Sequence, residues 1–466
     1  MPTLSGGPSG PDALRPLLRT VLDALREGAT ERRGPLPAGG PDRVDALVRG
    51  AADPVLPDRG DGPHQALHRL VHALALGSAD PAHPHCAAHL HPPPLALAVA
   101  ADLAASALNP SLDSWDQAPA ASALERTVTR TLAAEVYPRA PAPDALVTTG
   151  GTESNQLALL LARERHGPVR TVCGASAHHS VRRAAWLLGL PEPHTVPDAR
   201  GLDPDALHTA LDGLPGPHLV VATAGTTDTG RIDPLPAVAD RCAQHRAELH
   251  IDAAYGGGLL FSARHRPLLA GLDRADSVTL DLHKLGWQPV AAGLFAVADR
   301  ARLAPLALTA DYLNADDDTE AGLPDLLGRS PRTTRRPDIL KIAVTLRALG
   351  REGLAALVDQ VLATARRFAA LIEARPGLEL WEPPALATVL FRPAGAPDDE
   401  VARIRRALLA DGRAVLGRAR ADGRLWLKAT LLNPHATPGD LRRLIELVEG
   451  STSDDRPAHS RTRPAP

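Results

Sequence analysis

Residues 276–290, DSVTLDLHKLGWQPV, place a histidine and a lysine directly after a strand-like run. The chain contains only three lysines, Lys284, Lys341 and Lys428, and arginine supplies nearly all of the other positive charge. An arginine would serve equally well on the surface. Arginine is never deprotonated in proteins, however, and it cannot form a Schiff base with a carbonyl compound. Lys284 therefore indicates a chemical role, with an ordinary surface lysine as the alternative.

From residue 144 onward, short apolar runs alternate with segments of helical periodicity. This alternation is typical of an α/β fold with a mostly parallel central sheet and helices on both faces. Ligands of such sheets bind beyond the carboxyl ends of the strands, and the polar motifs described below fall at such ends. The predicted strands lie at residues 145–151, 169–175, 217–227, 247–257, 277–284 and 292–299, and the predicted helices at 152–167, 179–190 and 234–246.

The segments on either side of this pattern differ from it. Residues 1–85 contain amphipathic helices separated by Pro- and Gly-rich breaks, and we expect an N-terminal helical segment that takes part in dimerisation. Residues 86–340 would form the large domain. Residues 341–450 combine a long helical stretch with an α+β pattern, which predicts a small C-terminal domain. Residues 451–466 have the composition of a disordered tail.

The composition excludes several classes of protein. The chain has 466 residues, of which 44% are hydrophobic and 23% charged, as in a soluble globular protein. Its net charge of -3 gives no reason to expect a nucleic-acid partner. The N-terminus lacks the pattern of a secretory signal, and no apolar run reaches the roughly 18 residues of a membrane span. Cys86, Cys173 and Cys242 have neither disulfide nor metal spacing, so we expect a cytoplasmic protein.

Residues 148–155, TTGGTESN, join a predicted strand to a predicted helix through two glycines. The free N–H groups and the dipole at a helix N-terminus bind anions such as phosphate. Gly151 and Thr152 would supply backbone N–H groups and a hydroxyl. The alternative is a tight turn in which Thr152 caps the helix.

Asp252 stands at the end of the predicted strand at 247–257, among small and apolar residues. A carboxylate in such a place must be paired, and a heteroaromatic nitrogen that stays protonated is one possible partner. An ordinary cap or ion pair is the alternative. Ala254 points to the same side of the strand as Asp252, and its small side chain leaves room for a flat ring.

Further polar residues follow other predicted strands. His178 and His179 begin a predicted helix, where an imidazole would either stack on a flat cofactor or cap the helix. Thr223 and Thr226 stand at the end of the strand at 217–227. A lysine in the position of Lys284 needs partial desolvation or a neighbouring cation to act as a nucleophile.

A phosphate cradle, a carboxylate for a ring nitrogen, a stacking histidine and a Schiff-base lysine are together the parts of a pyridoxal 5′-phosphate (PLP) site. Their order and spacing, over about residues 83–449, resemble those of the group II PLP-dependent decarboxylases of fold type I. The segments that carry the resemblance are TTGGTESN, AHHSV, TAGTTDTG, HIDAAYGG and DSVTLDLHKLGWQP. The segment RTTRRPDILK resembles the diaminobutyrate and siderophore-type lysine decarboxylase branch, although Pro337 stands where an aromatic residue is usual.

The resemblance implies a role for each residue that would face the ring of the cofactor. Lys284 would form the covalent bond to the cofactor. Asp252 would pair with the pyridine nitrogen and keep it protonated. His178 would stack on one face of the ring, and Ala254 would pack against the other.

The resemblance also implies the residues on the phosphate side. Gly151 and Thr152 would cradle the phosphate with help from His283, and Thr223 would lie close to the cofactor. Asp281 stands near the expected phosphate, which a carboxylate would repel. It therefore has no settled role at this point.

Residues 311–325, DYLNADDDTEAGLPD, resemble the mobile catalytic loop of the family. Tyr312 would be the group that protonates the substrate Cα after CO2 has left. The acidic run and the glycine and proline are typical of a solvated, flexible lid. The family also forms an intertwined homodimer, which the amphipathic helices of residues 1–85 would suit.

The substrate is the least determined feature. The lid and the RTTRR segment favour a small-molecule diamino acid such as 2,4-diaminobutyrate, lysine or ornithine, whereas an aromatic or an acidic amino acid is the alternative. Asp113 and Asp116 would hold a distal ammonium or simply cap local turns. Lys428 would meet the substrate carboxylate or be structural, and Lys341 looks like an ordinary helix position. An aminotransferase or a carbon–sulfur lyase on the same fold remains a further alternative.

The alternatives from other classes are a metal-binding structural protein and a non-catalytic PLP-binding regulator. A histidine-rich loop at residues 83–94 contains His83, His85, His89 and His91, and such tracts can bind metal. The resemblance places this loop at the entrance of the active site, so we expect no metal there. A non-catalytic PLP-binding regulator would need an attached DNA-binding domain, and the N-terminal helices have no basic face.

Overall fold

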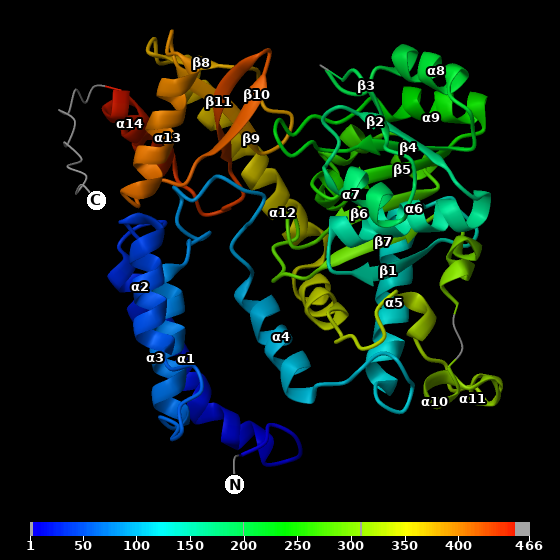
Figure 1. Ribbon diagram of the computed structural model, residues 1–466, viewed down its shortest axis with the longest axis horizontal. Coiled ribbons are helices and arrows are strands. Elements are labelled where there is room, and N and C mark those ends of the chain that lie inside the picture. Colours follow the sequence, from blue (N-terminus) through cyan, green and yellow to red (C-terminus); the bar gives the residue numbers. More distant parts are fainter. Residues whose placement is uncertain (1–2, 199, 308–309, 453–466) are drawn as a thin grey trace, which may run out of the picture.

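The computed structural model describes residues 3–198, 200–307 and 310–452, apart from the side chains of residues 311, 312 and 319. Figure 1 shows a large α/β part, a smaller C-terminal part and a bundle of N-terminal helices beside them. The predicted tail from residue 453 onward lies outside the described residues. Among the described helices, none is both long enough and apolar enough to cross a membrane.

The large part is built on a seven-stranded sheet with the order β1-β7-β6-β5-β4-β2-β3. β7 runs antiparallel to both of its neighbours, and the other six strands run in one direction. This confirms the predicted mostly parallel sheet. The strands are β1 (Asp144–Thr148), β2 (Arg170–Gly174), β3 (His194–Val196), β4 (His218–Thr223), β5 (Glu248–Ala253), β6 (Ser277–Asp281) and β7 (Gly293–Val297).

Helices cover both faces of this sheet, and alternation along the strands decides which residues each face receives. Leu219 and Val221 of β4 pack into a cluster with α6 (Gly151–His166) and α7 (Ser180–Leu187). Val220 and Ala222 of the same strand belong to a second cluster. That cluster includes residues of α5 (Pro119–Val136), α8 (Pro204–Gly213) and α9 (Leu235–His245).

The C-terminal part follows α12 (Ile339–Glu373), which bends at Gly350, where φ is 60°. It contains a four-stranded antiparallel sheet of order β10-β11-β9-β8. This confirms the predicted α+β pattern. Its elements are β8 (Leu378–Leu380), β9 (Thr388–Pro393), α13 (Asp398–Ala410), β10 (Gly417–Ala421), β11 (Arg424–Thr430) and α14 (Pro438–Thr452).

The N-terminal helices leave apolar side chains exposed. α1 (Gly10–Arg32) packs along α3 (Pro63–Gly77), and α2 (Gly40–Ala52) lies beside them, as Figure 1 shows in blue.

The remaining helical segments lie elsewhere in the chain. They are α4 (Ala96–Leu108), α10 (Asp311–Asn314), α11 (Asp316–Glu320), η1 (Gly256–Phe261), η2 (Arg266–Leu269), η3 (Leu272–Arg274), η4 (Arg300–Leu306) and η5 (Leu327–Arg329).

Lys341 does not occupy the ordinary helix position that its sequence predicts. Its side chain is 1% exposed, and its Nζ lies 3.1 Å from Asp102 and 3.2 Å from Asp338. Asp102 belongs to α4, so the ammonium joins α4 to the start of α12. The local sequence could not reveal this partner, because the two residues are far apart in the chain.

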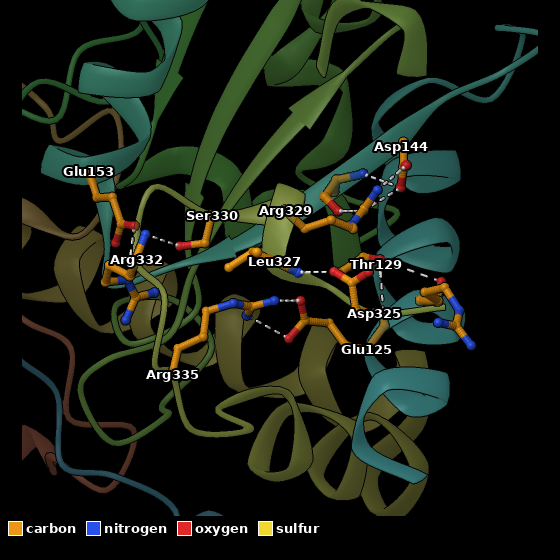
Figure 2. A network of polar contacts seen from close by, with 12 residues as sticks. Glu125, Thr129, Asp144, Glu153, Asp325, Leu327, Arg329, Ser330, Arg332 and Arg335 are labelled. Atoms are coloured by element: carbon orange, nitrogen blue, oxygen red, sulfur yellow. Dashed lines mark hydrogen bonds and ion pairs between the residues drawn. The ribbon is translucent and has the colours of Figure 1, made fainter. Parts of the chain in front are cut away.

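Three arginines fasten residues 325–336, here called the arginine segment, to the large part (Figure 2). Arg329 donates to both carboxylate oxygens of Asp144 on β1, and Arg332 donates to Glu153 on α6 at 3.2 Å. Arg335 donates to both oxygens of Glu125 on α5, at 2.9 and 2.7 Å. Only the last pair is fully buried, with side chains 2% and 1% exposed. The chain that follows the predicted lid is thereby held against β1, α5 and α6.

Replacing Arg335 with methionine should destabilise the protein by about 3–5 kcal/mol, because the Glu125 carboxylate would stay buried without its partner. The free energy of unfolding in urea measures this. The double variant Arg335→Met/Glu125→Leu should regain most of the loss. The matched control is Arg332→Met, whose pair is partly exposed and should cost only about 0–1 kcal/mol. Equal losses for the two single variants would contradict the assignment of Arg335–Glu125 as the principal anchor.

Candidate active site

A cavity of about 370 Å³ opens at the carboxyl ends of β4, β5 and β6. A larger cavity of about 810 Å³ lies between the N-terminal helices and the C-terminal part, but no lysine lines it. We take the smaller one as the site because it gathers the residues that the sequence singles out. It is lined by Leu90, Thr149, Gly150, Gly151, Thr152, His178, Thr223, Gly225, Thr227, Asp252, Ala254, Tyr255, Asp281, His283 and Lys284.

The turn between β1 and α6 forms one end of this cavity. Gly150 has a φ of 149°, and a Cβ there would lie 2.8 Å from the His283 ring. A Cβ on Gly151 would lie 3.0 Å from the Ala254 methyl group. Only glycines let the backbone pass so close to these side chains, and the first N–H groups of α6 have no partners within the helix. The turn therefore offers an anion site at this end.

Glu153 holds the turn in place. Its Oε2 accepts hydrogen bonds from the backbone N–H and the hydroxyl of Thr149, at 2.6 and 2.7 Å. Its other oxygen accepts from Arg332 of the arginine segment (Figure 2). The Glu153 carboxylate thus connects the arginine segment to the turn that forms the anion site.

Lys284 lies in the cavity, one turn after the end of β6. The Lys284 N–H donates to the Asp281 carbonyl at 3.1 Å, and this turn brings the two side chains together. The ammonium Nζ lies 3.0 Å from Oδ2 of Asp281, and His283 Nε2 lies 3.5 Å from the same oxygen. Asp281, whose role the sequence left open, is thus the counter-ion of Lys284.

Asp252 is buried, with 5% of its surface exposed, and its oxygens are bonded. Oδ2 accepts from the amide Nδ2 of Asn155 at 2.8 Å, and Oδ1 accepts from the Ala254 N–H at 3.0 Å. Asn155 Nδ2 also donates to the Ser180 hydroxyl at 2.9 Å, and that hydroxyl lies 2.8 Å from His178 Nδ1. One amide therefore positions both Asp252 and, through Ser180, His178.

His250 fixes the orientation of that amide. Burial lowers the pKa of His250 to about 4, so the ring is neutral at physiological pH. Nδ1 lies 2.8 Å from the Ser277 hydroxyl, and Nε2 lies 3.0 Å from Oδ1 of Asn155. Because the amide oxygen only accepts, Nε2 carries the proton and Nδ1 accepts from Ser277. Asp252 accepts from the Asn155 NH2 group, which turns the amide oxygen toward His250, and the bond from Nε2 holds it there.

The structure brings together eight of the sequence-predicted site residues and adds two that were missed. Asn155 ends the TTGGTESN motif without an assigned role, and no signal in the sequence singles it out. His250 precedes Asp252 by two residues and therefore points to the same side of β5. Tyr312 belongs to α10, but its side chain lies outside the described residues. The eight that line the cavity are Gly151, Thr152, His178, Thr223, Asp252, Ala254, His283 and Lys284.

Residues with open assignments lie outside the cavity lining. Lys428 donates to the backbone of Thr227 at 3.3 Å and to Asp228 at 3.1 Å, so it supports the rim rather than the interior. Asp113 accepts from Gln117 at 2.8 Å, and Asp116 accepts from Ser114 at 2.6 Å. Both acids therefore have local partners within their own turn.

The histidines of the loop at residues 83–94 do not gather around a common point. The rings of His83 and His85 meet edge to face at 5.1 Å, and His85 Nε2 lies 3.2 Å from the Asp440 carbonyl. The one grouping of three metal-ligating side chains within the described ranges lies elsewhere, at His208, Asp212 and His245.

The cavity fits PLP by three independent features. The glycine turn at the start of α6 matches a phosphate, and Asp252 matches a protonated ring nitrogen. Lys284 matches a carbonyl that forms a Schiff base. Two buried polar atoms, Asp281 Oδ1 and His283 Nδ1, lack a hydrogen-bond partner among the described residues. Such atoms in a cavity are expected where a polar ligand completes the bonding.

Comparisons with known proteins agree with this chemistry. Residues 48–394 match the family described as "Pyridoxal-dependent decarboxylase conserved domain". The L-2,4-diaminobutyrate decarboxylase of Rhizobium meliloti (strain 1021) is 43% identical over 88% of this chain and 87% of its own length. The enzyme of that name from Acinetobacter baumannii is 34% identical, over 84% of each chain. The fold also matches the glutamate decarboxylase domain of a Vibrio parahaemolyticus diaminobutyrate-pyruvate transaminase and L-2,4-diaminobutyrate decarboxylase. That match has a TM-score of 0.84 and 31% identity, and covers 96% of this chain and 97% of the other.

Replacing Asn155 with alanine should weaken PLP binding by about 10- to 100-fold, the range that loss of a supporting hydrogen bond costs at metal sites. Asp252 would lose its amide donor and Ser180 would no longer be held beside His178. Titration of the apoprotein with PLP, followed by visible absorbance, measures the dissociation constant. The control is Gln156→Ala on the same helix, which does not line the cavity and should bind PLP normally. Normal binding by Asn155→Ala would contradict the positioning role.

The buried His250 should also make stability depend on pH. The unfolded chain protonates this imidazole near its ordinary pKa of about 6.5, whereas the folded protein resists protonation down to about 4. The folded state should therefore lose about 3 kcal/mol from this residue as the pH falls from about 6.5 to 4. In His250→Gln, the slope of the unfolding free energy against pH should be smaller in this window, by the amount that corresponds to the uptake of one proton on unfolding. The same slope in both proteins would show that His250 contributes nothing.

Proposed function

The chain belongs to the pyridoxal-dependent decarboxylase family, and we propose that it decarboxylates a diamino acid, L-2,4-diaminobutyrate first among the candidates. The cofactor is PLP and the reaction is that of a PLP-dependent amino acid carboxy-lyase. The substrate proposal is carried by the 43% identity, over 88% of this chain, to the R. meliloti enzyme of that name. The release of CO2 from this substrate would leave 1,3-diaminopropane.

We propose that Lys284 is the covalent anchor of the cofactor and that Asp281 is its counter-ion. When bound, PLP supplies a carbonyl for the amine and a ring that accepts the electron pair released as CO2 leaves. The Lys284 Nζ lies 3.0 Å from Asp281, which holds the side chain inside the cavity. Whenever Lys284 is not bound to the cofactor, its ammonium would keep Asp281 as a partner. Without that partner, a charge inside the cavity would be costly.

Asp252 holds the proton on the ring nitrogen in this proposal. Its carboxylate is fixed by Asn155 and by the Ala254 N–H, so that it does not swing away when the ring arrives. His178 and Ala254 bound the space for the ring, and Thr223 lies at the end of β4 beside it. Burial lowers the pKa of His178 despite the opposing charge of Asp252, so the imidazole is neutral at physiological pH.

Gly151, Thr152 and His283 bind the phosphate in this proposal. The backbone N–H groups at the start of α6 and the Thr152 hydroxyl supply the donors. Burial lowers the pKa of His283 although Asp281 opposes the shift. A neutral imidazole can still donate one hydrogen bond to the phosphate. Asp281 is neutralised by Lys284, which removes the conflict between an acid and a phosphate in one cavity.

Tyr312 is the group that delivers the proton to the substrate Cα in this proposal. It belongs to the short helix α10, which together with α11 precedes the arginine segment. The three arginine pairs fix the chain directly after these helices (Figure 2). A lid attached in this way can move while its base stays in place.

We further propose a cytoplasmic homodimer. Support for a dimer comes from the apolar side chains that the N-terminal helices leave exposed, since patches of this kind mark association surfaces. Support for the cytoplasm comes from the three cysteines, all of which are free. The exposed apolar residues of the N-terminal helices are Leu22, Leu25, Val48, Leu70 and Leu74, and α4 adds Leu97, Val99, Leu103 and Leu108.

The test is a panel of L-amino acids with the purified holoenzyme, in which CO2 and amine are both measured. L-2,4-diaminobutyrate should give equimolar CO2 and 1,3-diaminopropane, with kcat/KM at least about tenfold above lysine, ornithine, tyrosine, glutamate and aspartate. Lys284→Ala should lose both the visible absorbance of bound PLP and CO2 release, whereas Arg347→Ala, exposed on α12, should keep both. Preference for an aromatic or an acidic substrate would overturn the substrate proposal. Unchanged PLP absorbance in Lys284→Ala would overturn the role of Lys284.

A further inference from the structure

We propose that His208, Asp212 and His245 form a binding site for a divalent transition-metal ion of the zinc type, away from the active site. His208 and Asp212 are one turn apart on α8, and His245 is the last residue of α9. Each side chain offers one ligand atom, and these three atoms lie within 4.8 Å of one another. Two imidazoles and one carboxylate are a ligand set that binds zinc and its neighbours rather than magnesium or calcium.

The three side chains already form a closed ring of contacts. His208 Nδ1 lies 2.7 Å from His245 Nε2. His208 Nε2 lies 3.4 Å from one oxygen of Asp212, and His245 Nδ1 lies 3.5 Å from the other. Ligand atoms around a tetrahedral zinc ion lie roughly 3.3 Å apart at bonds of about 2.0–2.1 Å. These contacts use both nitrogens of each imidazole, whereas an ion would take one atom from each side chain. One such set of atoms lies within 4.8 Å of one another, so side-chain rotation would bring them around an ion.

The packing of α8 on α9 sets up this cluster. Asp205 and Arg241, one turn earlier on the two helices, form an exposed ion pair at 2.6 Å, which shows that the same sides of the helices face each other there. Both helices end at the cluster, so the negative ends of two helix dipoles face it and favour a cation. Figure 1 shows the two helices side by side at the outer edge of the large part.

Exposure leaves room for the remaining ligands. The side chain of His245 is 13% exposed, whereas those of His208 and Asp212 are 43% and 63% exposed. An ion held by the three residues would complete its coordination with water, which makes the site a clamp between two helices. The clamp lies near the amino ends of β4 and β5, because α8 and α9 lead into those strands. Thr223 and Asp252 lie at the opposite ends, so decarboxylation should not depend on the ion.

Zinc binding to the holoenzyme, measured by titration calorimetry with ZnCl2, tests the proposal. The wild-type protein should take up one equivalent, and its thermal unfolding temperature should rise with zinc concentration. His245→Gln and Asp212→Asn should each weaken that equivalent by at least about tenfold and remove the rise. Asp212→Asn guards against misfolding, because this residue is largely exposed.

Two control variants separate this cluster from other histidines. His194→Gln changes an exposed histidine on β3, and His83→Gln changes the histidine-rich loop; both should keep the zinc equivalent. The proposal is overturned if the wild-type protein takes up no zinc. It is also overturned if His245→Gln and Asp212→Asn bind as the wild type does, or if the equivalent disappears in His83→Gln instead.

Discussion

The buried carboxylate of Asp252 is the group on which the arrangement of the site depends. A carboxylate with 5% exposure at the end of an apolar strand needs donors, because an unpaired charge in the interior costs several kcal/mol. The donors are the Asn155 amide on α6 and the Ala254 N–H after β5. Each such bond to a charged group contributes about 1.5–3 kcal/mol. The hydrogen bonds to Asp252 therefore hold α6 against β5. The position of α6 in turn decides where the anion site at its N-terminus lies.

Asn155 has hydrogen-bond partners beyond Asp252. Its oxygen is held by the neutral ring of His250, and its nitrogen also reaches Ser180 at the start of α7. A protonated His250 would present two donors and lose its bond from Ser277, so the low pKa of this histidine belongs to the architecture of the network. The carboxyl ends of parallel strands always offer a crevice. Here a chain of hydrogen bonds from β6 through β5 and α6 to α7 gives that crevice a defined set of polar groups.

Most residues that line the cavity were predictable from the sequence, whereas their supporting contacts were not. The glycine turn at residues 150–151, Asp252 and Lys284 each stand where a predicted strand ends, so strand alternation alone brings them to one edge. Asn155, Lys341 and the arginine segment each have at least one partner about 95 or more residues away in the chain. No periodicity marks such a partner. Asp281 lies between these cases, because its partner is three residues away but its burial depends on α6.

The three lysines show what the scarcity of lysine does and does not indicate. All three are largely buried, with side chains 20%, 1% and 9% exposed for Lys284, Lys341 and Lys428. In this chain a lysine therefore indicates a buried position, and does not by itself indicate a chemical role. Lys341 sits between two carboxylates and Lys428 between a carboxylate and a carbonyl. Lys284 has one carboxylate partner and faces a cavity with polar atoms still unbonded. Access to the cavity therefore separates Lys284 from the other two lysines, neither of which lines it.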